Sequence, residues 1–289
     1  MTTAAVLAVL AMACALASWR LTSARWTARA PRTAIFLWQS LGVTWGLAST
    51  GALLSYALAP RGVLPGLTAL GTGMPKRLDQ VLALAGGLTL LGVLIAVLLA
   101  AVAQTLSARR RHRVLLRLIA RDEPGVPGVR VVDHPGAAAY CLPGLKSQVV
   151  VSAGTLRLLS PDELRAVLAH EAAHARERHD LVLLPFAALR QAVPVARIAH
   201  DAVALLIEMA ADDRARRYCS AKRLATALLR FGSAGSIPAP NGALGAYSDH
   251  VMARVERLMR PATLPRHARL TIVAGSALLA MSAPLLWVI

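Results

Sequence analysis

Residues 170–174, which read His-Glu-Ala-Ala-His, have the types and spacing needed for hydrolytic metal chemistry. His170 and His174 are four positions apart, so on a helix both imidazoles lie on one face and can hold one ion. Glu171 follows the first histidine, where a carboxylate serves as the general base of a zinc hydrolase. The alternative is a solvated, charged helix face with incidental histidines. The motif predicts a zinc site with His170 and His174 as ligands and Glu171 as the catalytic residue.

A catalytic zinc also needs a third protein ligand, and the stretch "EMAADDRARRY" at residues 208–218 offers one. Glu208 and Asp212 are again four positions apart. We expect Glu208 to bind the metal and Asp212 to hydrogen-bond the free ring nitrogen of a ligand histidine, with Asp213 as the rival for that second role. The competing interpretation is an ordinary acidic helix N-terminus. The complete site would hold one Zn²⁺ per chain.

The first motif lies on a well-signalled helix at residues 159–178. Ser160 is its expected N-cap, Pro161 its first helical residue, and Glu163 completes a capping box. Ahead of this helix, residues 128–133, 137–144 and 147–152 are expected to form short strands, and residues 231–247 form a Gly/Pro/Ala-rich loop. The sequence therefore predicts an α+β, zincin-like domain.

The composition indicates a membrane protein. Of the 289 residues 56% are hydrophobic and only 16% are charged, an unusual balance for a soluble domain. A net charge of +17 would also fit nucleic-acid binding, but the basic residues lie beside the apolar runs, as in cytoplasmic segments of membrane proteins. We expect the lipid bilayer as a partner and no direct nucleic acid. The widely spaced Cys14, Cys141 and Cys219 support neither disulfides nor a thiolate zinc site.

Four stretches are long and apolar enough to cross a bilayer: residues 3–18, 34–60, 81–106 and 270–289. The first could instead be a cleaved signal peptide, but no basic residue precedes its apolar core. Arginines gather between the first two stretches and after the third, which by the positive-inside rule places the intervening domain in the cytoplasm and both termini outside.

The predicted fold is thus a mainly α integral membrane protein with about four transmembrane helices. Residues 1–106 form a three-helix transmembrane region, residues 107–269 a cytoplasmic metallopeptidase domain, and residues 270–289 the last span. A fifth span near 181–207 is not expected, since Pro185 and Pro194 divide it and its two ends must return to one metal ion. We expect an interfacial helical hairpin there, with His200 not a ligand.

Residues 137–184 and 208–216 together resemble the membrane zinc metallopeptidases of the BlaR/MecR type, gluzincins related more distantly to the HtpX and CAAX-protease group. The resemblance covers about 131–260 and the arrangement of spans. It implies His170, His174 and Glu208 as zinc ligands, Glu171 as catalytic base and Asp212 as their supporting carboxylate. It also implies a substrate-binding edge strand, formed here by Ala138, Ala139, Tyr140 and Cys141.

The function implied by this resemblance is a zinc endopeptidase of the bacterial cytoplasmic (inner) membrane, with its active site facing the cytoplasm. Its substrate would be a cytoplasmic or membrane-proximal protein or peptide, such as a transcriptional repressor in signal transduction, or the chain itself. One alternative is HtpX-like quality control of membrane proteins. Another is a non-catalytic membrane signalling scaffold. The sequence specifies neither the oligomeric state nor the activating signal.

The sequence departs from the BlaR/MecR pattern in two places. Many relatives have an aspartate five residues after the second histidine, where this chain has His179 followed by Asp180. That residue's orienting role could fall to His179, to Asp180 or to neither. The chain also ends at Ile289, within the last predicted span, so the extracellular penicillin-binding sensor of the antibiotic-sensing members is not expected.

Overall fold

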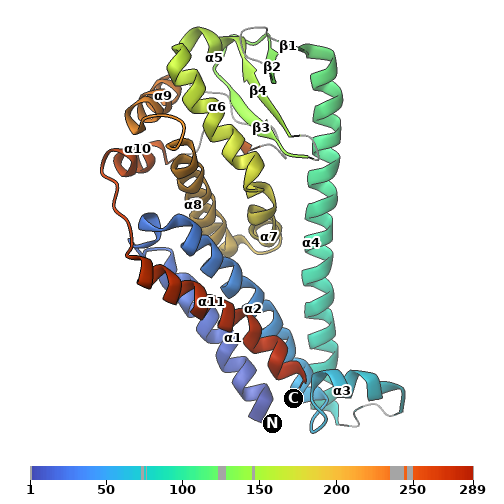
Figure 1. Ribbon diagram of the computed structural model, residues 1–289. Helices are drawn as coiled ribbons and strands as arrows, with labels where there is room; N and C mark the ends of the chain where they lie inside the picture. Colours follow the sequence, from blue (N-terminus) through green and yellow to red (C-terminus); the bar gives the residue numbers. More distant parts are fainter. Residues whose placement is uncertain are drawn as a thin grey trace. The chain divides into compact units, whose positions relative to one another are not determined.

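The computed structural model describes residues 2–72, 75, 77–122, 128–144, 147–234, 244–245 and 250–288. The chain divides into two compact units (Figure 1). Unit 1 comprises Met1–Leu99 with Leu264–Ile289, and unit 2 comprises Ala100–Thr263. The sequence placed the corresponding boundaries after residues 106 and 269. The long helix α4 (Leu78–Ile119) continues through the first boundary without a break.

Unit 1 is helical, and α2 (Pro31–Ala57) packs against both α1 (Thr2–Leu21) and α11 (Arg266–Val288). Thr44 of α2 donates its hydroxyl to the carbonyl of Leu279, 3.0 Å away. A Cβ at Gly51 would lie 2.1 Å from the indole nitrogen of Trp287, so a glycine is needed for this close approach. The shorter elements of the unit are η1 (Thr27–Arg29), α3 (Val63–Thr68) and η2 (Ala69–Thr72).

Three helices of the described part of the chain are long and apolar enough to cross a membrane: α1, α4 and α11. They match the first, third and fourth predicted spans and indicate a membrane protein. The second predicted span corresponds to α2, whose 27 residues suffice in length but are less apolar. The reason is that α2 lies between two other helices and buries small polar residues, such as Ser40 and Thr50, against its own carbonyls. The four-span topology therefore stays a prediction.

Unit 2 contains a five-stranded sheet with the order β1-β2-β4-β3-β5. The strands β2 (Val129–Val132), β3 (Ala139–Leu142) and β4 (Gln148–Ser152) confirm the three predicted from the sequence. The short outer strands β1 (Ala120–Asp122) and β5 (Leu244–Gly245) were not predicted. Strand β2 pairs parallel with β4, while all other pairs are antiparallel. Apart from β5, the predicted loop at 231–247 lies largely outside the described residues.

Helices cover both faces of this sheet. On one face Tyr140, Leu142 and Val150 pack against Leu116, near the end of α4. On the other face α6 (Pro161–Arg176) and α9 (Ala221–Ser233) cover the sheet (Figure 1). The core between them holds Val129, Val131, Ala137, Ala139, Val151, Leu159, Val167, Ala227 and Phe231. This second face positions the helix that carries the histidine motif.

Helix α6 begins as the sequence predicts. The Ser160 hydroxyl accepts from the amide of Glu163, and the Glu163 carboxylate accepts from the amide of Ser160, so the capping box is complete with Pro161 in the first turn. The Glu163 carboxylate also accepts from Arg230 of α9 at 2.9 Å. The start of α6 is thereby fixed both to its own backbone and to the neighbouring helix.

Replacing Ser160 by Ala should lower the free energy of unfolding by about 1 kcal/mol, because the amide of Glu163 loses its acceptor in the first turn of α6. Urea unfolding of the detergent-solubilised protein measures the change. Ser107→Ala, on an exposed position of α4, is the control and should alter stability by no more than about 0.5 kcal/mol. Equal effects of the two substitutions would contradict a role for the cap.

The predicted hairpin near 181–207 is present as two packed helices, α7 (His179–Ala192) and α8 (Arg197–Ala215), joined by η3 (Pro194–Ala196). Pro185 lies inside α7 and does not end it, whereas Pro194 opens the connecting turn. The interfacial location of this hairpin remains a prediction. The remaining helices of unit 2 are α5 (Ala153–Leu158) and α10 (Val251–Met259).

Candidate metal centre

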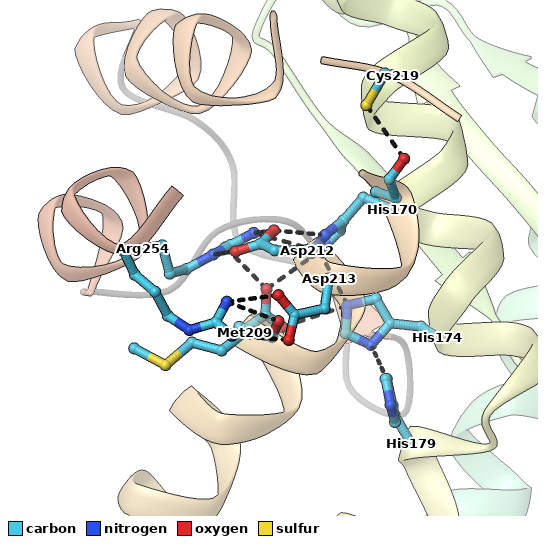
Figure 2. A network of polar contacts seen from close by, with 11 residues as sticks. His170, His174, His179, Met209, Asp212, Asp213, Cys219 and Arg254 are labelled. Carbon is cyan, nitrogen blue, oxygen red and sulfur yellow. Dashed lines mark hydrogen bonds and ion pairs between the residues drawn. The ribbon is translucent and has the colours of Figure 1, made fainter. Parts of the chain in front are cut away.

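The three predicted metal ligands meet between α6 and α8. The Nε2 atoms of His170 and His174 lie 3.1 Å apart. The Glu208 oxygens lie 3.3 Å from the first of these nitrogens and 3.5 Å from the second. All three side chains are buried, with ligand atoms within 4.8 Å of one another. Figure 2 shows the two imidazoles projecting from α6 toward the acidic residues of α8.

The chemistry of this cluster fits zinc. Two imidazole nitrogens with one carboxylate oxygen form the donor set of many catalytic zinc sites, in which the fourth position belongs to water or substrate. Burial lowers the pKa of His174 to about 3, which keeps its ring in the neutral form that a metal ligand needs. The cluster can therefore hold one zinc ion through His170, His174 and Glu208.

Asp212 has the position expected for a supporting carboxylate. Its Oδ1 lies 2.9 Å from the Nδ1 of His170, the ring nitrogen that faces away from the cluster. Its rival Asp213 instead forms a two-point ion pair with Arg257 of α10, at 2.8 and 2.7 Å. Of the two aspartates, the one a full helical turn after Glu208 therefore contacts the ligand histidine.

Arg254 of α10 is a major part of the site that the sequence analysis missed. The side chain is fully buried, and its Nε and Nη2 donate to the two Asp212 oxygens at 2.9 and 2.7 Å. Its Nη1 lies 2.8 Å from Glu208 Oε2. The sequence does contain a sign of this role. Arg254 falls on the same face of an amphipathic helix as Val251 and Leu258, and a charged residue on an apolar face needs a buried partner of opposite charge.

This arginine sets the charge state of the acidic residues. Burial alone would raise the pKa of Glu208, but Arg254 and the ligand histidines lower it to about 2. The pKa of Asp212 is held well below its usual range in the same way. Burial would lower the pKa of His170, yet Asp212 and Glu208 raise it to about 9. The negative charges of Asp212 and Glu208, which favour a proton on His170, would equally favour a metal cation beside its ring.

Glu171 differs from the other carboxylates of the site because it forms no ion pair among the described residues. The residue is fully buried, no described side chain hydrogen-bonds its carboxylate, and the backbone of Cys141 lies close enough to lower its pKa. Burial raises the pKa of Glu171 to about 8, with the charge of Glu208 acting in the same direction. A carboxylate with a pKa near neutrality, beside the first ligand histidine, can both accept and return a proton.

The structure distinguishes the two residues that follow the motif. His179 Nδ1 lies 3.0 Å from His174 Nδ1, on the side of that ring away from the cluster. Within the described part of the chain, Asp180 forms no hydrogen bond or ion pair with His174 and instead pairs with Arg109 of α4, 3.0 Å away. Of the alternatives left open by the sequence, His179 is thus the residue that contacts His174.

Strand β3 is not the free edge that the sequence analysis expected. Cys141 and Tyr140 pair with Leu244 and Gly245 of β5 on the side opposite β4. Ala138 precedes the strand and donates its amide to the hydroxyls of Ser152 and Thr155. The reason for the difference is a segment about 100 residues later in the chain, which adds an outer strand that has no local signal. The substrate-binding role of these residues stays a proposal.

Two histidines one helical turn apart with a carboxylate on a second helix are an arrangement typical of metallopeptidase domains. Comparison with protein families is consistent with this class, because residues 105–236 match Peptidase family M48. The matched residues lie within unit 2, and M48 peptidases are zinc metalloproteases. The matched region is slightly less than half of the chain.

Two curated proteins are similar to short parts of the chain. A Protease HtpX homolog of Thermoplasma acidophilum is 45% identical over 53 residues, 18% of this chain and 17% of that protein. A Protease HtpX homolog of Aeropyrum pernix is 48% identical over 56 residues, 19% of this chain and 18% of that protein. These alignments span less than a fifth of either relative. No solved structure matches the chain.

These similarities refine the resemblance to known membrane metallopeptidases. They support an M48 metallopeptidase with HtpX homologues as partial relatives, and they give no support to the BlaR/MecR type specifically. The motif around His170 was not sufficient to separate the two groups, because His-Glu-x-x-His recurs across zinc peptidases.

Proposed function

We propose that the protein is a zinc-dependent membrane endopeptidase that hydrolyses peptide bonds of cytoplasmic or membrane-proximal proteins. One observation carries the proposal: a buried cluster of His170, His174 and Glu208 lies next to Glu171, whose fully buried carboxylate forms no ion pair and no side-chain hydrogen bond among the described residues. A scaffold that only preserved its fold would have no need to bury an unpaired carboxylate, which is unfavourable. The proposed ligand and catalytic roles rest on this geometry.

When bound, zinc would supply Lewis-acid polarisation of the peptide carbonyl and acidify a water molecule. The protein's own part is the handling of the proton. Glu171 accepts it from the attacking water at a carboxylate oxygen and returns it to the leaving amine. Asp212 holds the tautomer and orientation of His170 through Nδ1, and His179 does the same for His174. Arg254 keeps Glu208 ionised and in place.

An extended substrate would bind to the sheet beside α6. Strand β3 presents its backbone at Tyr140 and Cys141, next to the helix that carries Glu171, and a peptide could add to it by β-augmentation. In the structure β5 takes this position, so a substrate cannot pair with the same two residues while β5 is there. Substrate binding at this strand would require β5 to separate from β3.

For the substrate class, the relatives favour the HtpX-like interpretation. Two proteins named Protease HtpX homolog match the chain, whereas no similarity supports cleavage of a signalling repressor. We therefore propose membrane-protein proteolysis as the function. The cytoplasmic orientation of the site in the inner membrane, with both termini outside, is part of this proposal and rests on the arginine distribution.

Metal removal tests the proposal. Treating the purified, detergent-solubilised protein with a zinc chelator should reduce cleavage of an unfolded test protein by more than about a hundredfold, and stoichiometric zinc should restore it. Magnesium should not restore activity, because this ion prefers oxygen ligands over imidazole. Cleavage that persists in excess chelator, with zinc absent by elemental analysis, would contradict a zinc peptidase.

A further inference from the structure

One face of α4 contacts the surroundings of the metal centre. It consists of Arg109, His112, Arg113 and Leu116, spaced at i, i+3, i+4 and i+7, so that they align along the helix. These four residues are wholly or partly buried, whereas the intervening Arg110, Arg111, Val114 and Leu115 are exposed. The part of α4 that belongs to unit 2 thus has one contacting face, named here the α4 site face.

Arg109 on the α4 site face pairs with the first turn of α7. Its Nη1 lies 3.0 Å from Asp180 Oδ2, and the two side chains are only 11% and 2% exposed. Pairs this well shielded hold their geometry more firmly than exposed pairs, since removing one member leaves an uncompensated buried charge. The Arg109 guanidinium therefore fixes the position of Asp180.

Asp180 follows directly after His179, the residue that contacts the second metal-ligand histidine. Both belong to the first turn of α7, and Arg178 before them has a left-handed conformation with φ of 50°. His179 Nδ1 lies 3.0 Å from His174 Nδ1. A displacement of Asp180 would shift this tight turn as a whole, and with it the ring that orients His174.

The other residues of the α4 site face hold the strand beside the site. His112 Nε2 lies 2.7 Å from the Tyr140 hydroxyl, and Arg113 donates to the carbonyl of Pro143 in the turn that follows β3. Arg178 donates to the carbonyl of Gly144 in the same turn. The α6–α7 turn and the end of β3 are therefore both held by this network.

From these contacts we infer that Arg109 is a positioning residue of the metal centre. It acts through Asp180 and His179 on His174, while His112 and Arg113 hold β3 on the same helix face. The inference rests on the proposed zinc site. Replacing a residue that hydrogen-bonds a metal ligand changes metal affinity or activity by about 10–100-fold. Because Arg109 acts two steps further out, through Asp180 and then His179, we expect an effect near the lower limit.

Arg109→Gln tests the inference, with Arg110→Gln as the matched control on the exposed side of α4. In the full-length, detergent-solubilised protein, Arg109→Gln should raise the zinc dissociation constant and lower kcat by about tenfold each, with KM within about twofold. The zinc constant comes from competition with a fluorescent chelator and needs no substrate. Arg110→Gln should match the wild type. Equal zinc affinity and kcat in the two variants would overturn the inference.

The route through Asp180 has its own test. If Arg109 acts through this carboxylate, the double variant Arg109→Gln, Asp180→Asn should lose no more zinc affinity than the worse single variant. Multiplied losses would overturn the route. Should Arg109→Gln not fold, Arg109→Lys keeps the charge but loses the planar donor geometry, and unchanged zinc affinity in this variant would equally overturn the inference.

Failure of this inference can be separated from failure of the proposed function. Chelator-sensitive cleavage by the wild type decides the function, whatever Arg109 does. The zinc dissociation constants decide the role of Arg109, even if no peptide is cleaved.

Discussion

Glu171→Gln should retain stoichiometric zinc and lose nearly all peptide cleavage, with kcat lower by about 10³-fold. The amide has the shape of the carboxylate but cannot accept a proton. Folding should tolerate the change, because Glu171 is fully buried without an ion pair or a side-chain hydrogen bond among the described residues, and a neutral side chain is easier to bury. Kinetics on a fluorogenic peptide, zinc analysis and a thermal melt measure the three quantities.

The control for this variant is Glu256→Gln, which makes the same chemical change on an exposed position of α10. It should leave kcat within about twofold of the wild type, as expected for a surface substitution. If Glu171→Gln binds zinc and cleaves at the wild-type rate, Glu171 is not the general base. If it loses zinc as well as activity, the carboxylate acts on the metal site and the assignment of roles is wrong.

The parts of the site that could be predicted are those whose geometry is local. His170 and His174 lie one turn apart on a helix whose start is encoded by Ser160 and Glu163, and the structure has both features. Their meeting with Glu208 followed from chemistry, since a two-histidine motif needs a third ligand. The spacing rules of a single helix therefore carried most of the prediction.

The parts that could not be predicted depend on contacts between distant segments. Arg254 lies 42 residues after Asp212 and 84 after His170, and it is one of many arginines in a chain with 32 basic residues. Strand β5 has only two residues and its pairing with β3 depends on a connection of about 100 residues. No local period or propensity encodes such contacts, because tertiary packing decides them.

The second predicted transmembrane stretch shows a different limit of sequence interpretation. Hydropathy measures how well a helix tolerates lipid, but α2 is packed between α1 and α11. Thr44 forms a hydrogen bond to α11, and Gly51 admits the ring of Trp287. Small and polar residues are characteristic of helix contacts inside membranes, and they lower the apparent hydropathy of the helix that makes most contacts.

Arg254→Met should destabilise the zinc-free protein by about 3–5 kcal/mol, the usual range for a broken buried ion pair. The substitution keeps most of the side-chain volume and removes the charge. Asp212 then loses two donors at 2.9 and 2.7 Å, and Glu208 loses its cation at 2.8 Å, with all three side chains buried. Urea unfolding in the presence of a chelator measures the loss.

Arg257→Met on the same helix is the matched control. Arg257 also forms a two-point pair, with Asp213, but the two side chains are 13% and 24% exposed. Water can therefore solvate the carboxylate after the change, and we expect a loss of about 1 kcal/mol. Equal losses in the two variants would mean that burial of the Arg254 pair adds nothing to stability.

The difference between wild type and Arg254→Met should also depend on pH. In the wild type the pKa of Glu208 is about 2, against 4.5 for the ordinary group, so the unfolded chain binds more protons between these values. Wild-type stability from this residue therefore increases as pH rises from about 2 to 4.5 and stays constant above. Arg254→Met lacks the cation that lowers this pKa, so its deficit should be greatest at neutral pH and smaller toward pH 2. A deficit that does not change with pH would show that Arg254 stabilises the site by packing and not by its charge.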